Sequence, residues 1–239
     1  SYLAQQMGID LVEGIDLIVN NNVVYKKTIE GLQKVDVVYR RVDDDFLDPD
    51  VGNSKSVIGV KGLIKAWKNK NVAIVNAPGC GIADDKAVYT YVPDMIKYYL
   101  NEDPILPNIK TFILKNKEDR NYAFENFTNM VFKPVAESGG YGIVIGRNIK
   151  KDDRSIIKKN ILKDPKNFVA QPLISLSTTP TFRKDSIFPR HLDLRPFILS
   201  GKETYVTVGG LTRVALKRGS TVVNSSQGGG SKDTWVVDA

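Results

Sequence analysis

Apolar runs of strand length alternate with segments of helical pattern along most of this 239-residue chain, and this alternation restricts the fold more than any other feature. Such a chain forms a mixed structure, because each element must bury its apolar face against another. Val35–Tyr39 and Val72–Val75 are β-branched runs that we expect as buried strands. Leu17–Val19 and Val23–Lys26 flank an asparagine-rich turn that is typical of a hairpin. The sequence therefore predicts an α/β or α+β fold.

The same patterns locate the other elements. The further expected strands are Asp10–Glu13, Thr111–Leu114, Met130–Val135, Ile143–Ile145, Phe168–Leu173, Leu192–Leu199, Glu203–Val208, Thr212–Leu216 and Thr221–Val223. The expected helices are Val57–Lys68, Lys86–Leu100 (divided at Pro93), Glu118–Phe127 and Asp153–Leu162. Two prolines make Asn101–Lys110 the best linker, so we expect one domain over residues 1–108 and a second over 109–239.

Composition excludes several classes of protein. Hydrophobic residues make up 42% of the chain, which rules out a wholly disordered or collagen-like protein. Cys80 and His191 each stand alone, so an intrachain disulfide and a histidine-rich zinc site are excluded and a reducing cytoplasm is favoured. We find no apolar run near the roughly 20 residues that span a bilayer, nor a signal-peptide pattern at the start. We therefore expect a cytoplasmic protein without a membrane partner.

The charge balance is basic, with 34 Lys and Arg residues against 27 Asp and Glu residues and a net charge of +7. A nucleic-acid binder is one class that carries such a balance. The basic residues are dispersed, however, and no basic strand carries the interleaved aromatic residues typical of single-strand binding. A solvated surface, or a small anionic ligand such as a nucleotide, explains the charge without nucleic acid.

The segment Phe132–Gly142 is the strongest motif. Lys133 follows the apolar part of an expected strand, a glycine-rich hairpin comes next, and a second strand returns. Glycines allow backbone N–H groups to approach a phosphate, and the lysine supplies positive charge to it. This is not a Walker loop, because the next element is a strand rather than a helix. An ordinary hairpin with a surface lysine is an equally weighted alternative on this segment alone.

A second segment, Phe168–Ile174, has a polar residue, Gln171, before a proline. Such a strand can offer backbone groups to the edge of an adenine ring, although an ordinary core strand also has this pattern. The order of the lysine–glycine hairpin, a helix and this strand is that of ATP-grasp enzymes. Further matching segments are Asn76–Val88, Asp193–Phe197, Gly209–Ala215 and Val223–Asp233.

On these segments the chain resembles the circularly permuted ATP-grasp family and, more remotely, eukaryotic glutathione synthetase and glutathionylspermidine synthetase. The resemblance covers nearly the whole chain. It implies an ATP-grasp fold of the circularly permuted kind, with a Rossmann-like substrate-side domain over 1–108 and the nucleotide-binding domain over 109–239. In the family, a Glu-Asn-containing stretch that helps hold magnesium lies upstream of the matched region. We therefore expect this chain to begin partway through the family pattern.

The resemblance also implies roles for individual residues. Lys133 matches the lysine that grips the nucleotide phosphates, and Glu137 matches a magnesium ligand. Lys86 matches an earlier ATP-binding lysine, and its expected place in the first turn of a helix, where a cation opposes the macrodipole, suits a shared anion. The implied phosphate-covering loop is Ser138, Gly139, Gly140, Tyr141 and Gly142, and the implied adenine hinge is Gln171, Pro172 and Leu173.

Substrate and catalytic residues are expected at two further places. Arg40 and Arg41 follow a buried strand, where the ligands of α/β sheets gather, and their guanidinium forks suit a carboxylate; a solvated charge run is the alternative. Asp193 and Arg195 alternate on one face of a strand and, with Arg213, are expected to line the reacting centre. Asn224, Gly228 and Gly229 belong to a segment that resembles the lid over the substrate.

The resemblance implies an enzyme that ligates a carboxylate to an amine at the expense of ATP, with Mg²⁺, through an acyl phosphate. Peptide-bond formation is one form of this reaction. The expected partners are small carboxylates and amines, such as an amino acid or a peptide, and a homodimer remains open. The main alternative is a catalytically inactive nucleotide-binding module with a regulatory or assembly role, and a nucleic-acid binder is less favoured.

Overall fold

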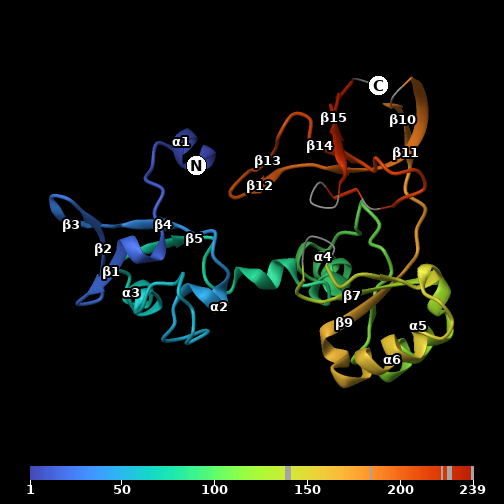
Figure 1. Ribbon diagram of the computed structural model, residues 1–239, viewed down its shortest axis with the longest axis horizontal. Coiled ribbons are helices and arrows are strands. Elements are labelled where there is room, and N and C mark those ends of the chain that lie inside the picture. Colours follow the sequence, from blue (N-terminus) through green and yellow to red (C-terminus); the bar gives the residue numbers. More distant parts are fainter. Residues whose placement is uncertain (138–140, 184, 222, 225–227, 238–239) are drawn as a thin grey trace. The chain divides into compact units, whose positions relative to one another are not determined.

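The computed structural model of the chain describes residues 1–137, 141–183, 185–221, 223–224 and 228–237 (Figure 1). Its contacts divide the chain into two units, Ser1–Val88 and Tyr89–Ala239. Each unit is described by itself below. Within the described residues, no helix is both long enough and apolar enough to cross a bilayer.

The first unit begins with a short helix, α1 (Tyr2–Met7), and a three-stranded antiparallel sheet in the order β1-β2-β3. Its strands are β1 (Leu17–Asn20), β2 (Val23–Thr28) and β3 (Gly31–Lys34). The predicted hairpin is confirmed, because Asn20 pairs with Val23 across a turn whose residues Asn21 and Asn22 have φ angles of 50° and 62°. The strand expected at Asp10–Glu13 is wrong: that segment is irregular up to the 3₁₀ turn η1 (Gly14–Asp16).

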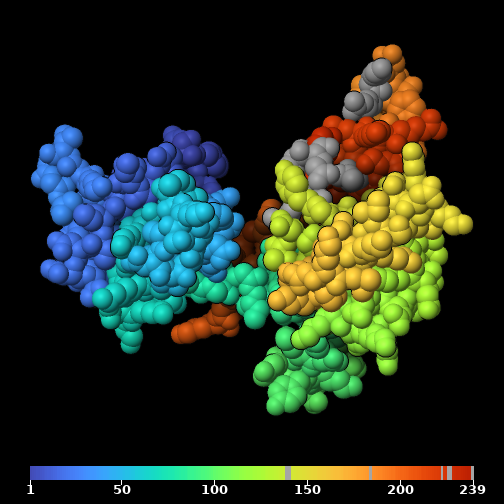
Figure 2. All heavy atoms as spheres, turned by 60° about the horizontal axis from the view of Figure 1, so that its bottom comes forward, coloured from blue at the N-terminus to red at the C-terminus, as the bar shows by residue number. Residues whose placement is uncertain are grey.

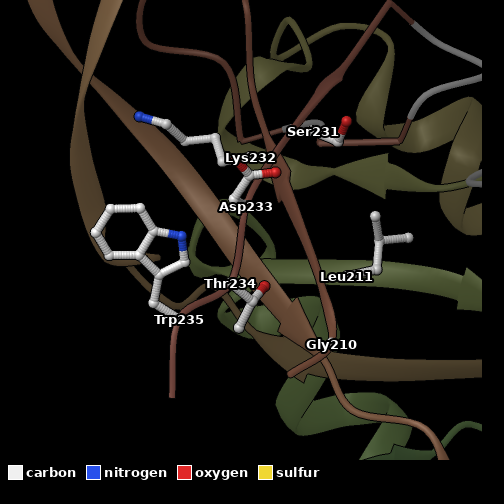
Figure 3. A pocket seen from close by; sticks show the side chains of 7 residues that line it. All are labelled: Gly210, Leu211, Ser231, Lys232, Asp233, Thr234 and Trp235. Atoms are coloured by element: carbon white, nitrogen blue, oxygen red, sulfur yellow. The ribbon is translucent and has the colours of Figure 1, made fainter. Parts of the chain in front are cut away.

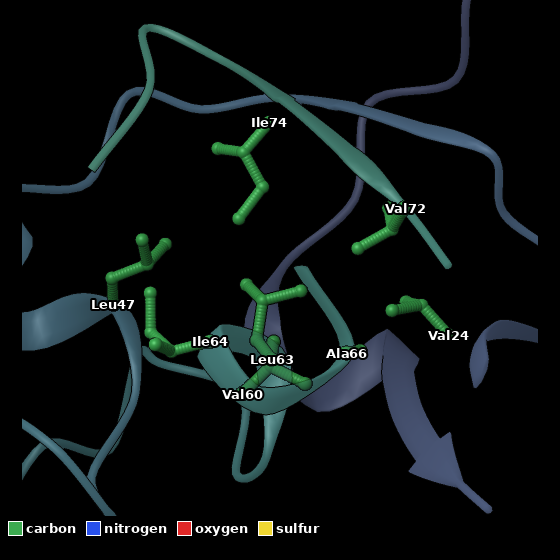
Figure 4. Packing of buried hydrophobic residues seen from close by; sticks show 8 residues of the cluster. All are labelled: Val24, Leu47, Val60, Leu63, Ile64, Ala66, Val72 and Ile74. Carbon is green, nitrogen blue, oxygen red and sulfur yellow. The ribbon is translucent and has the colours of Figure 1, made fainter. Parts of the chain in front are cut away.

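A parallel pair of strands, β4 (Val37–Tyr39) and β5 (Ala73–Val75), packs against helix α3 (Leu63–Lys68). The side chains between them form the core of this unit, shown in Figure 4: Val24, Leu47, Val60, Leu63, Ile64, Ala66, Val72 and Ile74. The helix expected from Val57 begins only at Leu63, because Gly62 has a left-handed φ of 82°. The backbone at Gly59 lies so close to Phe46 that only glycine fits, because a Cβ at this position would lie 2.1 Å from the Phe46 carbonyl oxygen.

Asp48 ties α3 to the loop that follows α2 (Asp44–Leu47). Its side chain is 1% exposed, and its carboxylate accepts three backbone N–H bonds. The donors are Asp50 at 3.0 Å, Gly62 at 3.1 Å and Ile64 at 2.9 Å. Two of these amides belong to the start of α3, where backbone N–H groups have no partner within the helix. One buried carboxylate therefore fixes the position of the helix against the core.

Between Ala77 and Asn101 the chain forms the 3₁₀ turns η2 (Cys80–Asp84) and η3 (Val88–Tyr91) and the helix α4 (Val92–Leu100). Pro93 lies in the first turn of α4, as expected of a proline that ends one helical segment and begins another. The helical segment expected from Lys86 to Pro93 is wrong, whereas the division at Pro93 and the helix that follows it are confirmed. Asp85 accepts the N–H groups of Ala87 and Val88, so Lys86 lies in a turn before η3, and the argument from the helix macrodipole does not apply to it.

In the second unit, one four-stranded antiparallel sheet has the order β6-β9-β7-β8. Its strands are β6 (Phe112–Ile113), β7 (Met130–Pro134), β8 (Val144–Ile145) and β9 (Phe168–Pro172). Helices α5 (Lys117–Glu125) and α6 (Arg154–Lys163) lie side by side, joined by the bond from Lys158 Nζ to the Phe124 carbonyl (2.8 Å; Figures 1 and 2). Short 3₁₀ turns complete this region: η4 (Phe127–Asn129), η5 (Gly146–Asn148) and η6 (Pro165–Asn167).

The core of this sheet lies on the face that the helices cover. Phe132 of β7 pairs with Ala170 of β9, which also pairs with Phe112 of β6, and these three side chains are buried with Ala123 of α5 and Ile161 of α6. Because strand side chains alternate between faces, the residues next to Phe132 and Ala170 lie on the opposite face. That opposite face carries the candidate site described below.

A second antiparallel sheet has the order β10-β11-β14-β15. The chain between β11 and β14 forms the separate two-stranded sheet β12-β13. The strands are β10 (Thr178–Arg183), β11 (Ser186–Arg195), β12 (Ile198–Ser200), β13 (Thr204–Val206), β14 (Leu211–Val214) and β15 (Gly230–Lys232). Strand β10 and the first half of β11 were not expected. Thr221 and Val223 are not in a strand, and Val222 lies outside the described residues. Instead Gly230, directly after the lid-like Gly228 and Gly229, pairs with Val214.

We predict that Asp48→Ala destabilises the first unit. The substitution leaves the amides of Asp50, Gly62 and Ile64 without their carboxylate, and each unsatisfied buried donor costs about 1–3 kcal/mol. Urea unfolding followed by the fluorescence of Trp67, which packs against this core, measures the loss. The matched control is Asp50→Ala, because that carboxylate is half-exposed and only pairs with Lys61 at 3.5 Å. Equal midpoints for the two variants would contradict the assignment.

Candidate functional site

Lys133 lies on the face of the first sheet of the second unit that points away from α5 and α6. It follows the buried Phe132 in β7 and pairs in register with Val169, which is fully buried in β9. Lys133 is therefore rooted in a packed strand pair, while its ammonium group is only part-buried. This arrangement holds a positive charge at a defined place on the sheet face that the helices leave uncovered.

A chain of hydrogen bonds runs from Lys133 across β9. Lys133 Nζ donates to Gln171 Oε1 at 2.6 Å, and Gln171 Nε2 donates to Thr111 Oγ1 at 2.7 Å. Thr111 Oγ1 in turn donates to the Ile109 carbonyl at 3.0 Å. The side chains of Gln171 and Thr111 are buried, at 8% and 9% exposure. The structure thus brings together two of the predicted nucleotide-binding residues and adds Thr111, which the sequence analysis did not find.

The hairpin that follows Lys133 is confirmed, because β8 returns antiparallel to β7 with Phe132 opposite Val144. Gly142 has a φ of 67°, and a Cβ there would lie 2.7 Å from Pro134 Cγ, so this position requires glycine. Tyr141 is exposed. Ser138, Gly139 and Gly140, the rest of the predicted phosphate loop, lie outside the described residues.

Glu137, the predicted magnesium ligand, is an exposed residue directly before that gap in the described chain. Across the described residues, no group of three or more His, Cys, Asp or Glu side chains is arranged so that it could hold a metal ion. Glu137 as a ligand therefore stays a prediction.

The predicted adenine hinge, Gln171–Leu173, lies at the end of the central strand β9. Gln171 uses its side chain rather than only its backbone, as described above. The Leu173 N–H donates to the Asn129 carbonyl at 2.8 Å, which extends the ladder between β9 and β7 by one bond. Contact of this hinge, including Pro172, with adenine remains a prediction.

The predicted reacting-centre residues form one cluster on the second sheet. Asp193 of β11 is directly opposite Arg213 of β14. Asp193 Oδ1 is 3.5 Å from Arg213 Nε, and Asp193 Oδ2 is 3.2 Å from Arg195 Nη2. Arg213 is the more buried of the two arginines, with its side chain 12% exposed against 51% for Arg195. Arg213 Nη2 is buried and has no hydrogen-bond partner among the described residues, so it can donate to an anion.

The segment that resembles a lid is described only in part. Gly228 has a φ of 82°, and the Gly229 N–H donates to the Asn224 carbonyl at 2.9 Å. A Cβ on Gly229 would lie 2.2 Å from the Val223 carbonyl oxygen, so the chain passes close to itself here. The backbones of Asn224 and Gly229 are therefore in contact, and the contact of Asn224, Gly228 and Gly229 with a substrate stays a prediction.

Beyond this turn, the edge strand β15 and residues Asp233–Trp235 border a cavity of about 750 Å³ (Figure 3). Figure 3 shows the Lys232 and Trp235 side chains extending to the same side of the strand. Lys232 is held there, because its Nζ donates to the Pro180 carbonyl at 2.5 Å. The cavity is lined by Gly210, Leu211, Ser231, Lys232, Asp233, Thr234 and Trp235.

The predicted substrate arginines and Lys86 belong to the first unit. Arg40 is largely engaged inside that unit: its guanidinium pairs with Asp44 at 2.5 Å and donates to the Val42 carbonyl at 2.6 Å, and also to the Asn76 carbonyl. These contacts hold the Asn76–Gly81 loop. Arg41 is exposed and lines a largely apolar cavity of about 900 Å³ beside α1. Substrate binding by Arg40 and Arg41, and nucleotide binding by Lys86, remain predictions.

Comparison with known families decides what these features belong to. The family described as circularly permuted ATP-grasp type 2 matches residues 1–215. The chain belongs to this family. Its fold is therefore of the ATP-grasp kind, as the sequence analysis predicted from the lysine–glycine hairpin and the β9 strand.

Several relatives share high sequence identity with this ATP-grasp chain. An uncharacterised protein of Synechocystis sp. is 52% identical over 238 residues, which cover 99% of this chain and 50% of that protein. An uncharacterised protein of Mycobacterium tuberculosis is 50% identical over 99% of this chain and 43% of its own length. A Frankia casuarinae protein named "Putative glutamate--cysteine ligase 2-2" is 43% identical over 99% of this chain and 27% of its own length. The chain spans about half, or less, of the length of these curated relatives.

One solved structure, D-alanine–D-alanine ligase from Helicobacter pylori, superposes with a TM-score of 0.37 at 13% identity. The match covers 89% of this chain and 54% of that ligase. A likeness of this size adds no argument about function.

We predict that Asp193→Ala destabilises the second sheet of the second unit. Arg213 is nearly buried, and removing its anionic partner leaves an uncompensated charge, which costs about 1–3 kcal/mol. Hydrogen exchange of the β11 and β14 amides, read by mass spectrometry, measures the loss of local stability. Asp185→Ala, at an exposed residue before β11, is the control and leaves the exchange unchanged. Unaltered exchange in Asp193→Ala would show that the pair does not support the sheet.

Proposed function

We propose that the protein is an ATP-dependent carboxylate–amine ligase. The observation that carries the proposal is the anchored ammonium of Lys133, which lies on the face of the sheet opposite the helices, at the base of a glycine hairpin in an ATP-grasp chain. The name of the Frankia relative, a glutamate–cysteine ligase, supports a reaction that joins a carboxylate to an amine. The acid and the amine are small molecules, such as amino acids or a peptide.

The residues present fit a polyphosphate ligand. Lys133 provides a cation beside a hairpin whose Gly142 position tolerates no side chain. In the other sheet, Arg213 Nη2 is buried without a hydrogen-bond partner among the described residues, so it has an unused donor for an anion. Lys133, with the Tyr141–Gly142 hairpin, would hold the phosphates, Gln171 to Leu173 the adenine, and Glu137 a magnesium ion.

When bound, ATP would supply a phosphoryl group to the carboxylate, which would give an acyl phosphate and ADP; the amine would then attack the acyl carbon, form the amide and displace inorganic phosphate. The part of the chain's own residues is positioning and charge neutralisation. Lys133 and Arg213 donate to anionic oxygens, and Asp193 keeps Arg213 oriented. Arg40 and Arg41 are proposed to receive the carboxylate substrate, and Asn224, Gly228 and Gly229 to exclude water. We propose that the enzyme works in the cytoplasm.

We predict that Lys133→Met lowers ATP affinity at least about tenfold, or roughly 1.4 kcal/mol. Methionine keeps most of the aliphatic stem and removes the charge. Calorimetric titration with ATP measures the change. The control is Lys158→Met, because Lys158 bonds to the Phe124 carbonyl on the helix side of the same unit. ATP affinity that is unchanged in a folded Lys133→Met variant would remove this lysine from the nucleotide site.

We further predict that Glu137→Gln raises the magnesium concentration needed for half-maximal ATP turnover. Magnesium prefers charged oxygen ligands in octahedral geometry, and an amide replaces a carboxylate poorly. Phosphate release, followed during a magnesium titration with a mixed pool of amino acids, measures the effect. Glu125→Gln, at the exposed end of α5, is the control.

These assays also distinguish the alternative function. A catalytically inactive module binds ATP in the calorimeter and releases no phosphate in any pool. A ligase releases phosphate only when the matching acid is present. If Glu137→Gln and the parent need the same magnesium concentration, Glu137 is not a ligand.

A further inference from the structure

We infer that Gln171 and Thr111 are positioning residues for Lys133: they hold its ammonium through a neutral, one-directional chain of hydrogen bonds. The inference rests on the proposed function in so far as Lys133 serves an anionic ligand. It goes beyond a hinge that contacts adenine, because it assigns the Gln171 side chain to the lysine and adds a threonine from the segment before β6.

The direction of the chain follows from what each group can donate. An ammonium only donates, so the atom of Gln171 that faces Lys133 at 2.6 Å must be the carbonyl oxygen Oε1. The amide nitrogen then points to Thr111 Oγ1 at 2.7 Å. Thr111 Oγ1 accepts that bond, and its hydroxyl donates a hydrogen bond to the Ile109 carbonyl at 3.0 Å. Each of these three bonds thus has its donor on the Lys133 side, and this order cannot be reversed while the Lys133 ammonium donates to Gln171.

Because Gln171 and Thr111 are buried, breaking this chain of hydrogen bonds costs free energy. Gln171 is 8% exposed and Thr111 is 9% exposed, so an unsatisfied polar atom on either side chain is costly. Gln171 also lies next to the fully buried Ala170 in the central strand, which leaves its side chain little freedom to leave the face. The lysine is therefore held by an anchor that is itself fixed at both ends.

The neutral charge of the anchor is the second half of the inference. A carboxylate at position 171 would also bind the ammonium, but it would place a negative charge against Lys133 and oppose an incoming phosphate. A carboxylate at position 171 also has no N–H group that could donate to Thr111 Oγ1. The Thr111 hydroxyl would then have to donate to this carboxylate and would lose its hydrogen bond to the Ile109 carbonyl. Glutamine fixes the lysine without adding a negative charge of its own, which suits a site for a polyanion.

The first test measures binding of inorganic tripolyphosphate, ATP and adenosine by calorimetry. We expect Gln171→Glu to weaken tripolyphosphate and ATP at least about tenfold, because a full charge is introduced in contact with the ammonium. Adenosine has no phosphate, so its affinity should fall less in Gln171→Glu than the affinity for tripolyphosphate. Parent-like tripolyphosphate affinity in a folded Gln171→Glu variant overturns the charge argument. A parent chain that binds none of the three ligands instead overturns the proposed function.

The second test needs no ligand and addresses the positioning alone. Lysine acetylation by an N-hydroxysuccinimide ester is followed by mass spectrometry, well below the melting temperature of each variant. Loss of one hydrogen bond, worth about 0.5–1.5 kcal/mol, should speed acetylation of Lys133 about threefold to tenfold in Gln171→Met. Thr111→Val, which does not touch Lys133, should act in the same direction by releasing Gln171. Thr111→Ser keeps the hydroxyl and should match the parent.

Lys158 is the internal reference in every sample, because its ammonium bonds to the Phe124 carbonyl on the other side of the sheet. A purely structural role for the buried pair would lower the melting temperature and leave the ratio of Lys133 to Lys158 acetylation unchanged. An unchanged ratio in both Gln171→Met and Thr111→Val overturns the inference. If Gln171→Met does not fold, the Thr111 pair of variants decides alone.

Discussion

The alternation of side chains along β7 is the constraint on which the second unit depends. Phe132 points into the core under α5 and α6, and the next residue, Lys133, must point to the other face. The same holds on β9 for Ala170 and Gln171. One pair of strands thus supplies both the packed floor of the core and the polar face of the candidate site. A slip of one residue in their register would bury the lysine and expose the phenylalanine, so the core itself keeps the site in place.

Much of this fold could be predicted from the sequence, because the elements that bury a regular pattern are the ones found. The hairpin at Asn21–Asn22, strands β7 and β9 and helix α6 agree with their patterns to within a few residues. The errors occur where backbone geometry overrides pattern. Gly62 delays α3, the Asp85 carboxylate holds Lys86 in a turn, and Gly230 enters a strand because its partner Val214 lies on a neighbouring edge. None of these three effects can be recognised from the pattern of apolar residues nearby in the sequence.

The candidate site, too, could be predicted from the sequence only in part. The sequence placed Lys133 beside a glycine hairpin and put Asp193 and Arg195 on one face, and the structure confirms both placements. It did not find Thr111, since a threonine at the start of a strand has no pattern that marks it as the partner of a glutamine 60 residues later. The sequence also did not show that Arg40 is bonded within its own unit. The Arg40-Arg41 pattern is the same whether Arg40 binds a ligand or donates to three backbone carbonyls, as it does here.

The two sheets of the second unit hold their cations in chemically different ways. Arg213 is oriented by a carboxylate, Asp193, which offsets its charge and is still 27% exposed on its side chain. Lys133 donates to Gln171, a buried amide that carries no charge and helps to orient it. An ion pair is the costlier arrangement to bury, and it also reduces the field that an arriving anion experiences. Where a residue must grip a polyphosphate, a neutral anchor keeps both orientation and charge. Where a guanidinium must instead be aimed across a strand pair, an aspartate directly opposite it fixes the geometry, and Nη2 keeps a donor that no other described residue uses.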